Sequence, residues 1–142
     1  MRLMSNQTTF IDKEKKLPIN NADLKICIKY KGTINIINLN EISYIERVGR
    51  KTFIHLSDGN QITCNESLKS LNNILENYGF YRIHQSFIVA IDKIKKVEVD
   101  HNGRDYIVNM QSHNSPVWLS KYKYQQLKAL LWKNSIFGIS MN

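Results

Sequence analysis

Apolar and polar side chains alternate regularly in residues 24–30. The apolar positions of this segment are Leu24, Ile26, Ile28 and Tyr30. A period of two is typical of a β-strand with one buried face. Because Gly32 permits a tight turn, we expect residues 33–37 to pair back on the first strand as a hairpin.

The same alternation of strands and turns continues through most of the chain. Asp58-Gly59 and Asn102-Gly103 are turn sequences, and we expect the second to form the tight pair of a hairpin turn. Pro116 has no N–H to donate, so its strand is expected at a sheet edge. The further strands are predicted within residues 42–45, 52–56, 61–64, 87–91, 94–99, 106–110 and 115–119.

Two segments instead have helical spacing. Residues 66–78 place apolar side chains on one stripe, and Gly79 follows where a C-terminal glycine is expected. The stripe consists of Leu68, Leu71, Ile74, Leu75 and Tyr78. A capping box of Thr63 with Glu66, or a cap by Asn65 or Ser67, would begin this helix. Ser120 is expected to cap the second helix, which has Tyr124, Leu127 and Leu131 on one side.

About eight or nine strands and two helices predict a mainly β protein. Because hairpins connect the strands, the sheets should be antiparallel. A length of 142 residues fits one domain, which we place at residues 22–134. Residues 1–21 are polar and lack a period, so we expect a flexible arm there, and residues 135–142 form a tail.

The charge distribution narrows the class of partner. Lys and Arg number 20 and Asp and Glu 12, so 20 − 12 gives +8, and no acidic residue follows Asp105. Uncompensated positive potential favours nucleic acid or an acidic membrane surface. No apolar run reaches the roughly 18–20 residues of a membrane span, and the N-terminus has no signal-peptide core. We therefore expect a cytoplasmic protein with no membrane partner.

Motifs for catalysis or metal binding are missing from the sequence. The four histidines are in different local settings, without HExxH or a paired Cys/His spacing. Cys27 and Cys64 fit no CxxC pattern and are expected to be reduced, although sequence alone does not exclude a disulfide. We predict no enzymatic activity, no metal, no cofactor and no small-molecule substrate.

Three polar segments carry groups that bind nucleic acid. The first is the basic turn of Arg47, Arg50 and Lys51, since arginine pairs with guanine or with phosphate. The second is His84, Gln85 and Ser86, where Gln matches adenine N6 and N7 and Ser binds phosphate. The third is Lys121, Tyr122 and Lys123, at a helix N-terminus whose N–H groups favour anions.

Structural roles compete with DNA contact at several of these positions. Arg47 either contacts DNA or pairs with an acid such as Glu46. His84 either contacts a base or bonds a backbone carbonyl. Arg50 and Lys51 are alternatively solvated turn charges. Gln85 has no evident role in a core, which favours contact.

The segment FYRIHQSFIV, residues 80–89, resembles the Arg-Ile-His-x-Ser-aromatic-Ile-Val signature of the LytTR family of bacterial DNA-binding domains. Other segments resemble family landmarks in the same order, and together they cover about residues 23–131. These are ISYIE at 42–46, Asp58-Gly59, SLKSL at 67–71 and WLSK at 118–121.

The resemblance implies a particular fold and DNA surface. The family fold is an elongated stack of three mostly antiparallel β-sheets, here with one short mid-chain helix and a C-terminal helix. The family binds promoter DNA through loops. The resemblance implies that the DNA contacts of the family correspond in this sequence to Arg50 and Lys51, to Gln85, and to residues 121–123. These positions agree with the segments chosen from side-chain chemistry.

Three departures from the family pattern bear on DNA recognition. Gln85 and Lys121 stand where the family often has arginine, and Ala90 where it often has asparagine. Fewer arginines mean fewer bidentate guanine contacts, so target and affinity are expected to differ. The usual partner of the family, a phosphorylatable receiver domain, does not fit in 21 residues. We expect either an excised effector domain or a stand-alone regulator.

These patterns together predict a sequence-specific transcriptional regulator that reads the major groove of double-stranded promoter DNA through loops. Two copies are expected on a repeated site. The missing arginines leave open a protein-interaction or inhibitory module that has lost DNA binding. RNA binding is a third alternative, and it requires exposed aromatic side chains for stacking.

Overall fold

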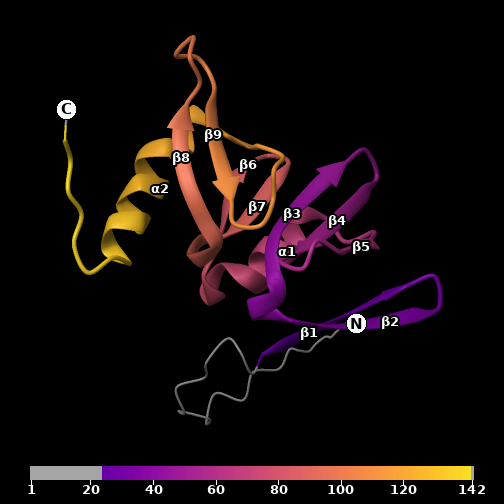
Figure 1. Ribbon diagram of the computed structural model, residues 1–142. Coiled ribbons are helices and arrows are strands. Elements are labelled where there is room, and N and C mark those ends of the chain that lie inside the picture. Colours follow the sequence, from indigo (N-terminus) through magenta and orange to yellow (C-terminus); the bar gives the residue numbers. More distant parts are fainter. Residues whose placement is uncertain (1–23, 142) are drawn as a thin grey trace.

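The computed structural model describes residues 24–141 of the chain (Figure 1). The predicted flexible arm, residues 1–21, lies outside the described residues. The described part contains ten strands, two α-helices and three short 3₁₀ helices. The strands are β1 (Lys25–Tyr30), β2 (Thr33–Asn38), β3 (Ile42–Val48), β4 (Lys51–Leu56), β5 (Gln61–Cys64), β6 (Phe80–His84), β7 (Phe87–Ala90), β8 (Ile94–Val99), β9 (Tyr106–Met110) and β10 (Val117–Leu119). The helices are α1 (Leu68–Leu75) and α2 (Lys121–Lys133), with 3₁₀ turns at Leu39–Glu41, Glu76–Tyr78 and Ile91–Lys93.

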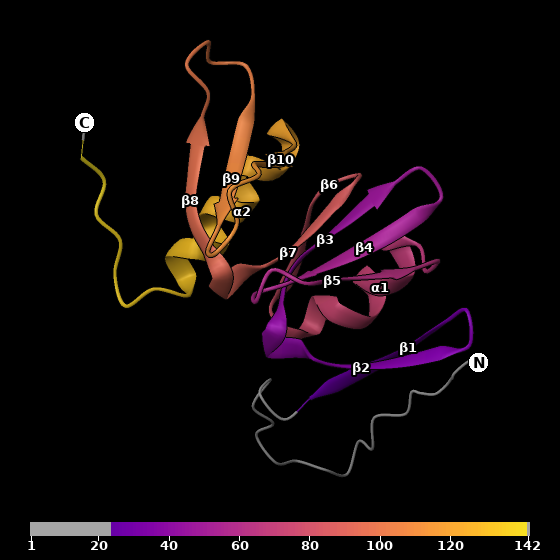
Figure 2. The same ribbon diagram turned by 45° about the vertical axis from the view of Figure 1, so that its right-hand side comes forward.

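The strands form three antiparallel sheets, as the family resemblance predicted. β1 and β2 form a two-stranded sheet, and the central sheet has the order β5-β4-β3-β7-β6. The third sheet has the order β10-β9-β8. Figures 1 and 2 show these sheets stacked, with α1 between the first two and α2 against the third. The prediction of a mainly β stack with two helices is therefore confirmed.

The central sheet is buried on both faces, which divides the core in two. Alternate residues of one strand point to opposite faces, so Ile45 joins the core with α1 while Tyr44 joins the core with α2. Ile88 and Val89 of β7 separate in the same way, and both are fully buried. Burying such an aliphatic side chain contributes about 1.5–3 kcal/mol. Because the central sheet buries side chains in both cores, it holds the β1–β2 sheet and the third sheet in place on either side.

The third sheet confirms one turn prediction and corrects another. β10 is an edge strand that begins directly after Pro116, as expected. The Asn102-Gly103 pair, however, does not form a two-residue hairpin turn. Val99 pairs with Tyr106, so the β8–β9 connection covers residues 100–105. The Asp100 N–H donates to the Asp105 carbonyl oxygen over 2.8 Å, which closes this longer loop instead.

The helix ends follow the expected chemistry. Ser67 caps α1, with its hydroxyl accepting the Ser70 N–H, and Ser120 caps α2 by accepting the Tyr122 N–H. Gly79 follows α1 and its 3₁₀ turn with a φ of 85°, the left-handed conformation that favours glycine. Ile74 was wrongly placed on the buried stripe, since its side chain is 52% exposed. Six residues after Leu68, it lies off the stripe of Leu68, Leu71 and Leu75.

The described residues also bear on the membrane and cysteine expectations. Among them, no helix is long and apolar enough to cross a membrane. Both cysteines are free: Cys27 is exposed and Cys64 is buried in the core beside α1. Within residues 24–141, no three acidic, His or Cys side chains are grouped as metal ligands.

Candidate nucleic-acid interface

The β3–β4 turn presents two exposed cations. Val48 pairs with Lys51, so Gly49 and Arg50 are the two central turn residues. Gly49 has a φ of 61°, whereas Arg50 has no positive φ, the pattern of a type II′ hairpin turn. Arg50 and Lys51 are both exposed at this tip. The turn therefore displays the predicted cations to solvent on a short, defined support.

Arg47 braces this turn from inside. Its guanidinium Nη1 donates to Thr52 Oγ1 over 2.8 Å and to the Glu66 carbonyl oxygen over 3.1 Å. Its Nε donates to the Gly49 carbonyl oxygen over 3.1 Å. The Thr52 hydroxyl in turn donates to the Glu66 carbonyl oxygen over 2.6 Å. Arg47 thus ties the turn to the segment before α1, which is a different setting from that of the exposed Arg50.

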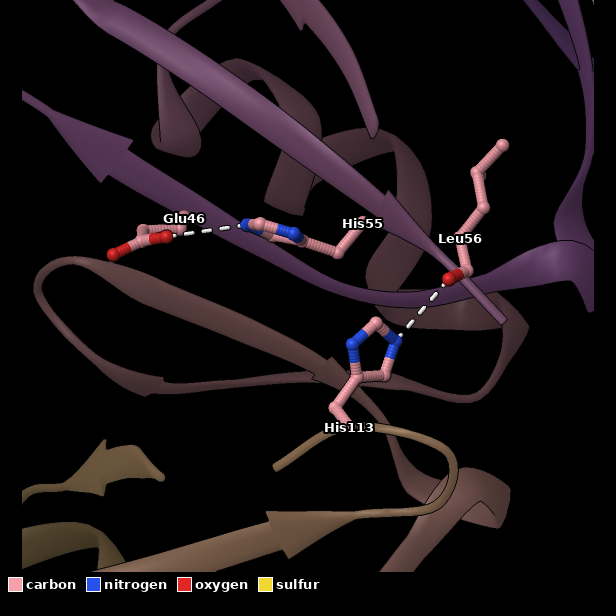
Figure 3. Close-up of polar contacts among 4 residues, drawn as sticks. All are labelled: Glu46, His55, Leu56 and His113. Carbon is pink, nitrogen blue, oxygen red and sulfur yellow. Dashed lines mark hydrogen bonds and ion pairs between the residues drawn. The ribbon is translucent and has the colours of Figure 1, made fainter. Parts of the chain in front are cut away.

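Glu46, the acid suggested as an alternative partner for Arg47, pairs with His55 instead. Figure 3 shows the His55 Nε2 and a Glu46 carboxylate oxygen, which are 3.1 Å apart. The His55 ring stacks on Tyr44 with centroids 4.2 Å apart. Desolvation lowers the pKa of His55, and nearby His113 acts in the same direction, while the hydrogen bond to Glu46 opposes them.

His113 links the β9–β10 connection to the central sheet. Its Nε2 lies 3.1 Å from the Leu56 carbonyl oxygen of β4, as Figure 3 shows. Its ring meets the Tyr44 ring edge-on at 5.2 Å and the His55 ring at 6.1 Å. These contacts hold the segment that leads into β10, and hence to the start of α2, against the sheet that carries the basic turn.

The β6–β7 turn is supported by two side chains. His84 pairs with Phe87, so Gln85 and Ser86 are the central residues, and neither has a positive φ. This turn therefore lacks the primed geometry that matches hairpin twist. The Ser86 N–H donates to His84 Nδ1 over 3.0 Å, and Arg82 Nη2 donates to the Gln85 carbonyl oxygen over 2.7 Å. These two side-chain hydrogen bonds stabilise the turn, whose backbone geometry is not one of those that favour a two-residue hairpin.

These bonds leave the Gln85 side chain on the surface. Gln85 is exposed, whereas His84 and Ser86 are half-buried. His84 does have a structural bond, but its Nδ1 accepts from a backbone N–H, whereas the expected partner was a backbone carbonyl. A ring nitrogen that accepts carries no proton, so in the neutral ring the proton is on Nε2. Gln85 is the residue of this turn with the most freedom to contact a ligand.

The third segment begins α2. Lys121 is exposed, and Tyr122 is 91% exposed. Lys123 is half-buried, with its Nζ 5.3 Å from the centre of the Tyr81 ring. The helix N-terminus adds backbone N–H groups and the positive end of the helix dipole to these cations.

Two backbone hydrogen bonds bring the three segments together. The Arg47 N–H donates to the Ser86 carbonyl oxygen over 2.9 Å, which joins the first turn to the second. The register of β6 shifts between Arg82 and His84, and the Ile83 carbonyl oxygen accepts the Ser120 N–H over 2.9 Å. The second turn is thereby joined to the start of α2. We call residues 49–51, 84–86 and 120–123 the three-segment edge; its two hairpin turns lie at one end of the central sheet (Figure 2).

The structure adds two arginines that the sequence reasoning did not select. Arg82 supports the second turn, and the signals available for it were its position two residues before His84 and its match to the arginine of the family signature. Arg104, in the β8–β9 connection, lines an open concave surface next to the three-segment edge. The same surface includes His84, Asp105, Tyr106, Trp118, Leu119, Ser120 and Lys121. Nothing in the spacing of the sequence places residue 104 beside residue 121.

Comparisons with known proteins agree on the identity of the fold. The LytTr DNA-binding domain family matches residues 32–132. The chain is 29% identical over 97 residues to the sensory transduction protein LytT of Oceanobacillus iheyensis, covering 68% of this chain and 39% of that protein. It is 28% identical over 120 residues to the transcriptional regulatory protein NatR of Bacillus subtilis, covering 84% and 49%. The match thus spans at most about half the length of these relatives.

A solved structure supports the same assignment at the level of the fold. It is a LytTr DNA-binding domain from Bacillus cereus, with a TM-score of 0.63 and 22% sequence identity. The alignment covers 75% of this chain and 95% of the solved chain. Because the family match extends over residues 32–132 and the sheet arrangement is shared, this chain belongs to the LytTr DNA-binding domain family.

Proposed function

We propose that the chain binds specific double-stranded promoter DNA through the three-segment edge and regulates transcription. The proposal goes beyond family membership, because it states which surface meets DNA and that base sequence is read in the major groove. It is supported by the two relatives, a sensory transduction protein and a transcriptional regulatory protein.

The observation that carries the proposal is the pair of backbone hydrogen bonds that join the three segments of the edge. Arg47 to Ser86 and Ser120 to Ile83, each 2.9 Å, hold three separate chain segments in one arrangement. A site that reads bases needs such preorganisation, because ordering loose loops on binding costs free energy. The groups so held are cations, an amide and a helix N-terminus, which match phosphates and base edges.

The exposed residues of the edge, together with the half-buried Ser86 and Lys123, receive the contacting roles. Gln85 offers a donor and an acceptor for an adenine edge, and Arg50 offers a fork for guanine or phosphate. The lysines of the edge, Lys51, Lys121 and Lys123, neutralise phosphates. Ser86 and Tyr122 have hydroxyl groups suited to phosphate oxygens.

Arg47 and His84 receive positioning roles. The Arg47 guanidinium is bonded to three internal acceptors at 2.8–3.1 Å, and His84 Nδ1 is bonded to the Ser86 N–H. A side chain used in this way shapes a turn and contributes to DNA binding through the neighbouring residues. This revises the direct contact that their sequence positions first indicated.

Two copies on a repeated site form a further part of the proposal. A single edge of three short segments offers only a few base contacts, and each good bidentate contact contributes about 1–3 kcal/mol of discrimination. Doubling the contacts on a repeated site would supply the missing specificity. Stoichiometry on duplexes with one or two copies of the selected site tests this part.

The experiment is a selection of bound fragments from random duplex DNA, followed by a titration with the selected duplex. We expect a shared motif, and binding that weakens linearly in log–log form as salt rises. A scrambled duplex and a single-stranded RNA of equal length are the controls. Absence of salt-dependent duplex binding at low ionic strength would refute the proposal and favour a protein-interaction module. Preference for the RNA would favour the third alternative.

A further inference from the structure

The connection between β8 and β9, residues 100–105, lies next to the three-segment edge. Arg104 shares an open concave surface with His84, Ser120 and Lys121. In Figure 2 the tip of the β8–β9 hairpin projects upward at the left, and the β6–β7 and β3–β4 turns lie further to the right. The shared concave surface thus places a fourth segment beside the three assigned to DNA.

Hydrogen bonds within the turn give it a defined shape. Asp100 Oδ1 accepts the Arg104 N–H over 3.2 Å and the Asp105 N–H over 3.3 Å. The Gly103 N–H donates to the Asp100 carbonyl oxygen over 2.9 Å. The Asp100 carboxylate is therefore used to close the turn, and the Arg104 backbone is held at a fixed place beside α2.

The Arg104 side chain itself is not used inside the protein. It is exposed, and within residues 24–141 its guanidinium makes no hydrogen bond and no ion pair. The ion pairs of that part of the chain are Glu46 with His55 and Lys96 with Glu98. Arg47 and Arg82, in contrast, both donate to internal acceptors. An arginine on a hydrogen-bonded turn, with a guanidinium that has no partner in the described part of the chain, suits a phosphate, which it can bind through two parallel hydrogen bonds.

We propose that Arg104 adds a fourth segment to the DNA surface, binding a backbone phosphate beyond the one met by Lys121. The inference rests on the proposed function of the three-segment edge. Asp105, next to Arg104 and also exposed, places a negative charge in the same concave surface. The two residues therefore act on a phosphate with opposite sign. If the turn faces the duplex, removing either charge must change the affinity for DNA. If the turn faces away, removing either charge leaves the affinity unchanged.

The test measures the affinity of the full chain for its selected duplex by fluorescence anisotropy over a series of NaCl concentrations. Arg104→Gln is expected to weaken binding several-fold and to reduce the slope of log K against log salt by about one unit. Asp105→Asn is expected to strengthen binding. Lys29→Gln is the control, because Lys29 is an exposed cation on β1, in the opposite outer sheet. Thermal midpoints of the variants check that each is folded.

The outcomes separate this inference from the function on which it rests. If wild type and Lys29→Gln bind alike, while the affinities of Arg104→Gln and Asp105→Asn shift in opposite directions, the contact by Arg104 is supported. If wild type binds with salt dependence but both turn variants behave as Lys29→Gln does, the Arg104 assignment is wrong and the three-segment edge stands. If wild type shows no salt-dependent binding, the proposed function itself fails.

Discussion

The N–H of Ser120 donates to the carbonyl oxygen of Ile83 over 2.9 Å, joining the first residue before α2 to a strand of the central sheet. The shift of register between Arg82 and His84 accompanies this bond. Such irregularities re-aim backbone groups in a sheet. The orientation of the helix N-terminus is therefore coupled to the turn that carries Gln85, and these two parts of the edge are expected to act as a unit.

Replacing Gln85 by Ala should affect the reading of sequence. The exposed amide is proposed to match an adenine edge, so its loss should reduce the preference for the selected duplex over a scrambled one by about 1–3 kcal/mol. Affinity for the scrambled duplex should change little, because phosphate contacts remain. Titration of both duplexes at one salt concentration measures the difference. Equal losses on the two duplexes would remove Gln85 from the reading role.

Replacing Lys121 by Ala should affect all duplexes alike. An exposed lysine that neutralises one phosphate contributes through counterion release, so the slope of log K against log salt should fall by about one unit. The ratio of specific to scrambled affinity should stay constant. Anisotropy titrations over a salt series measure both quantities. A changed ratio with an unchanged slope would mean that Lys121 contacts a base.

Replacing Arg47 by Lys should weaken the fold of the basic turn although the charge is kept. Lysine cannot reproduce the fork that reaches Thr52, Gly49 and Glu66. Hydrogen bonds made by charged groups contribute about 1.5–3 kcal/mol each, and the lost ones should lower the free energy of unfolding by a comparable amount. Urea unfolding measures the loss. Arg50→Lys is the matched control and should unfold like wild type. Similar stability of the two variants would leave Arg47 as a direct DNA contact.

Stability should decline as pH falls below about 6.5, the ordinary pKa of a histidine. The folded state holds the pKa of His55 lower, chiefly through desolvation, so below pH 6.5 the unfolded chain binds more protons at this site. The state that binds more protons becomes relatively more stable as pH falls. Here that state is the unfolded chain, so the free energy of unfolding decreases. The groups that face His55 are Glu46, Tyr44 and His113.

Thermal midpoints recorded from pH 7.5 to 5.5 test this dependence. They should drop more for wild type than for His55→Gln, which removes the titrating ring. Asp100 also has a shifted pKa: desolvation acts to raise it, but hydrogen bonds from the Asp105 and Arg104 backbones outweigh this and lower it. Its contribution is therefore confined to more acidic conditions. Parallel curves for wild type and His55→Gln would show that His55 does not titrate in this range.

The local parts of the fold were predictable because local chemistry decides them. Alternation predicted the β1–β2 hairpin, Ser120 the cap of α2, and Gly79 a helix end. For α1 the sequence left three possible caps open, and the structure has Ser67. The β8–β9 turn was mispredicted, because the Asp100 carboxylate favours a longer loop than its Asn-Gly pair suggests.

The distant parts of the site could not be derived from spacing. Arg47 bonds to Glu66, which is 19 residues away, and His113 bonds to Leu56, which is 57 residues away. Such contacts depend on how the sheets stack, and the pattern of a single strand does not contain that information. The choice of Gln85 rested on a polar side chain with no role in a core, and this argument needed no long-range contact.

The most direct measurement is an NMR titration of the isotope-labelled chain with its selected duplex. Backbone amides of residues 49–51, 84–86 and 120–123 should shift together and saturate at the same DNA concentration, while those of β1 and β2 should stay unchanged. Shifts confined to one of the three segments, or centred on the β1–β2 sheet, would show that the duplex does not lie along the three-segment edge.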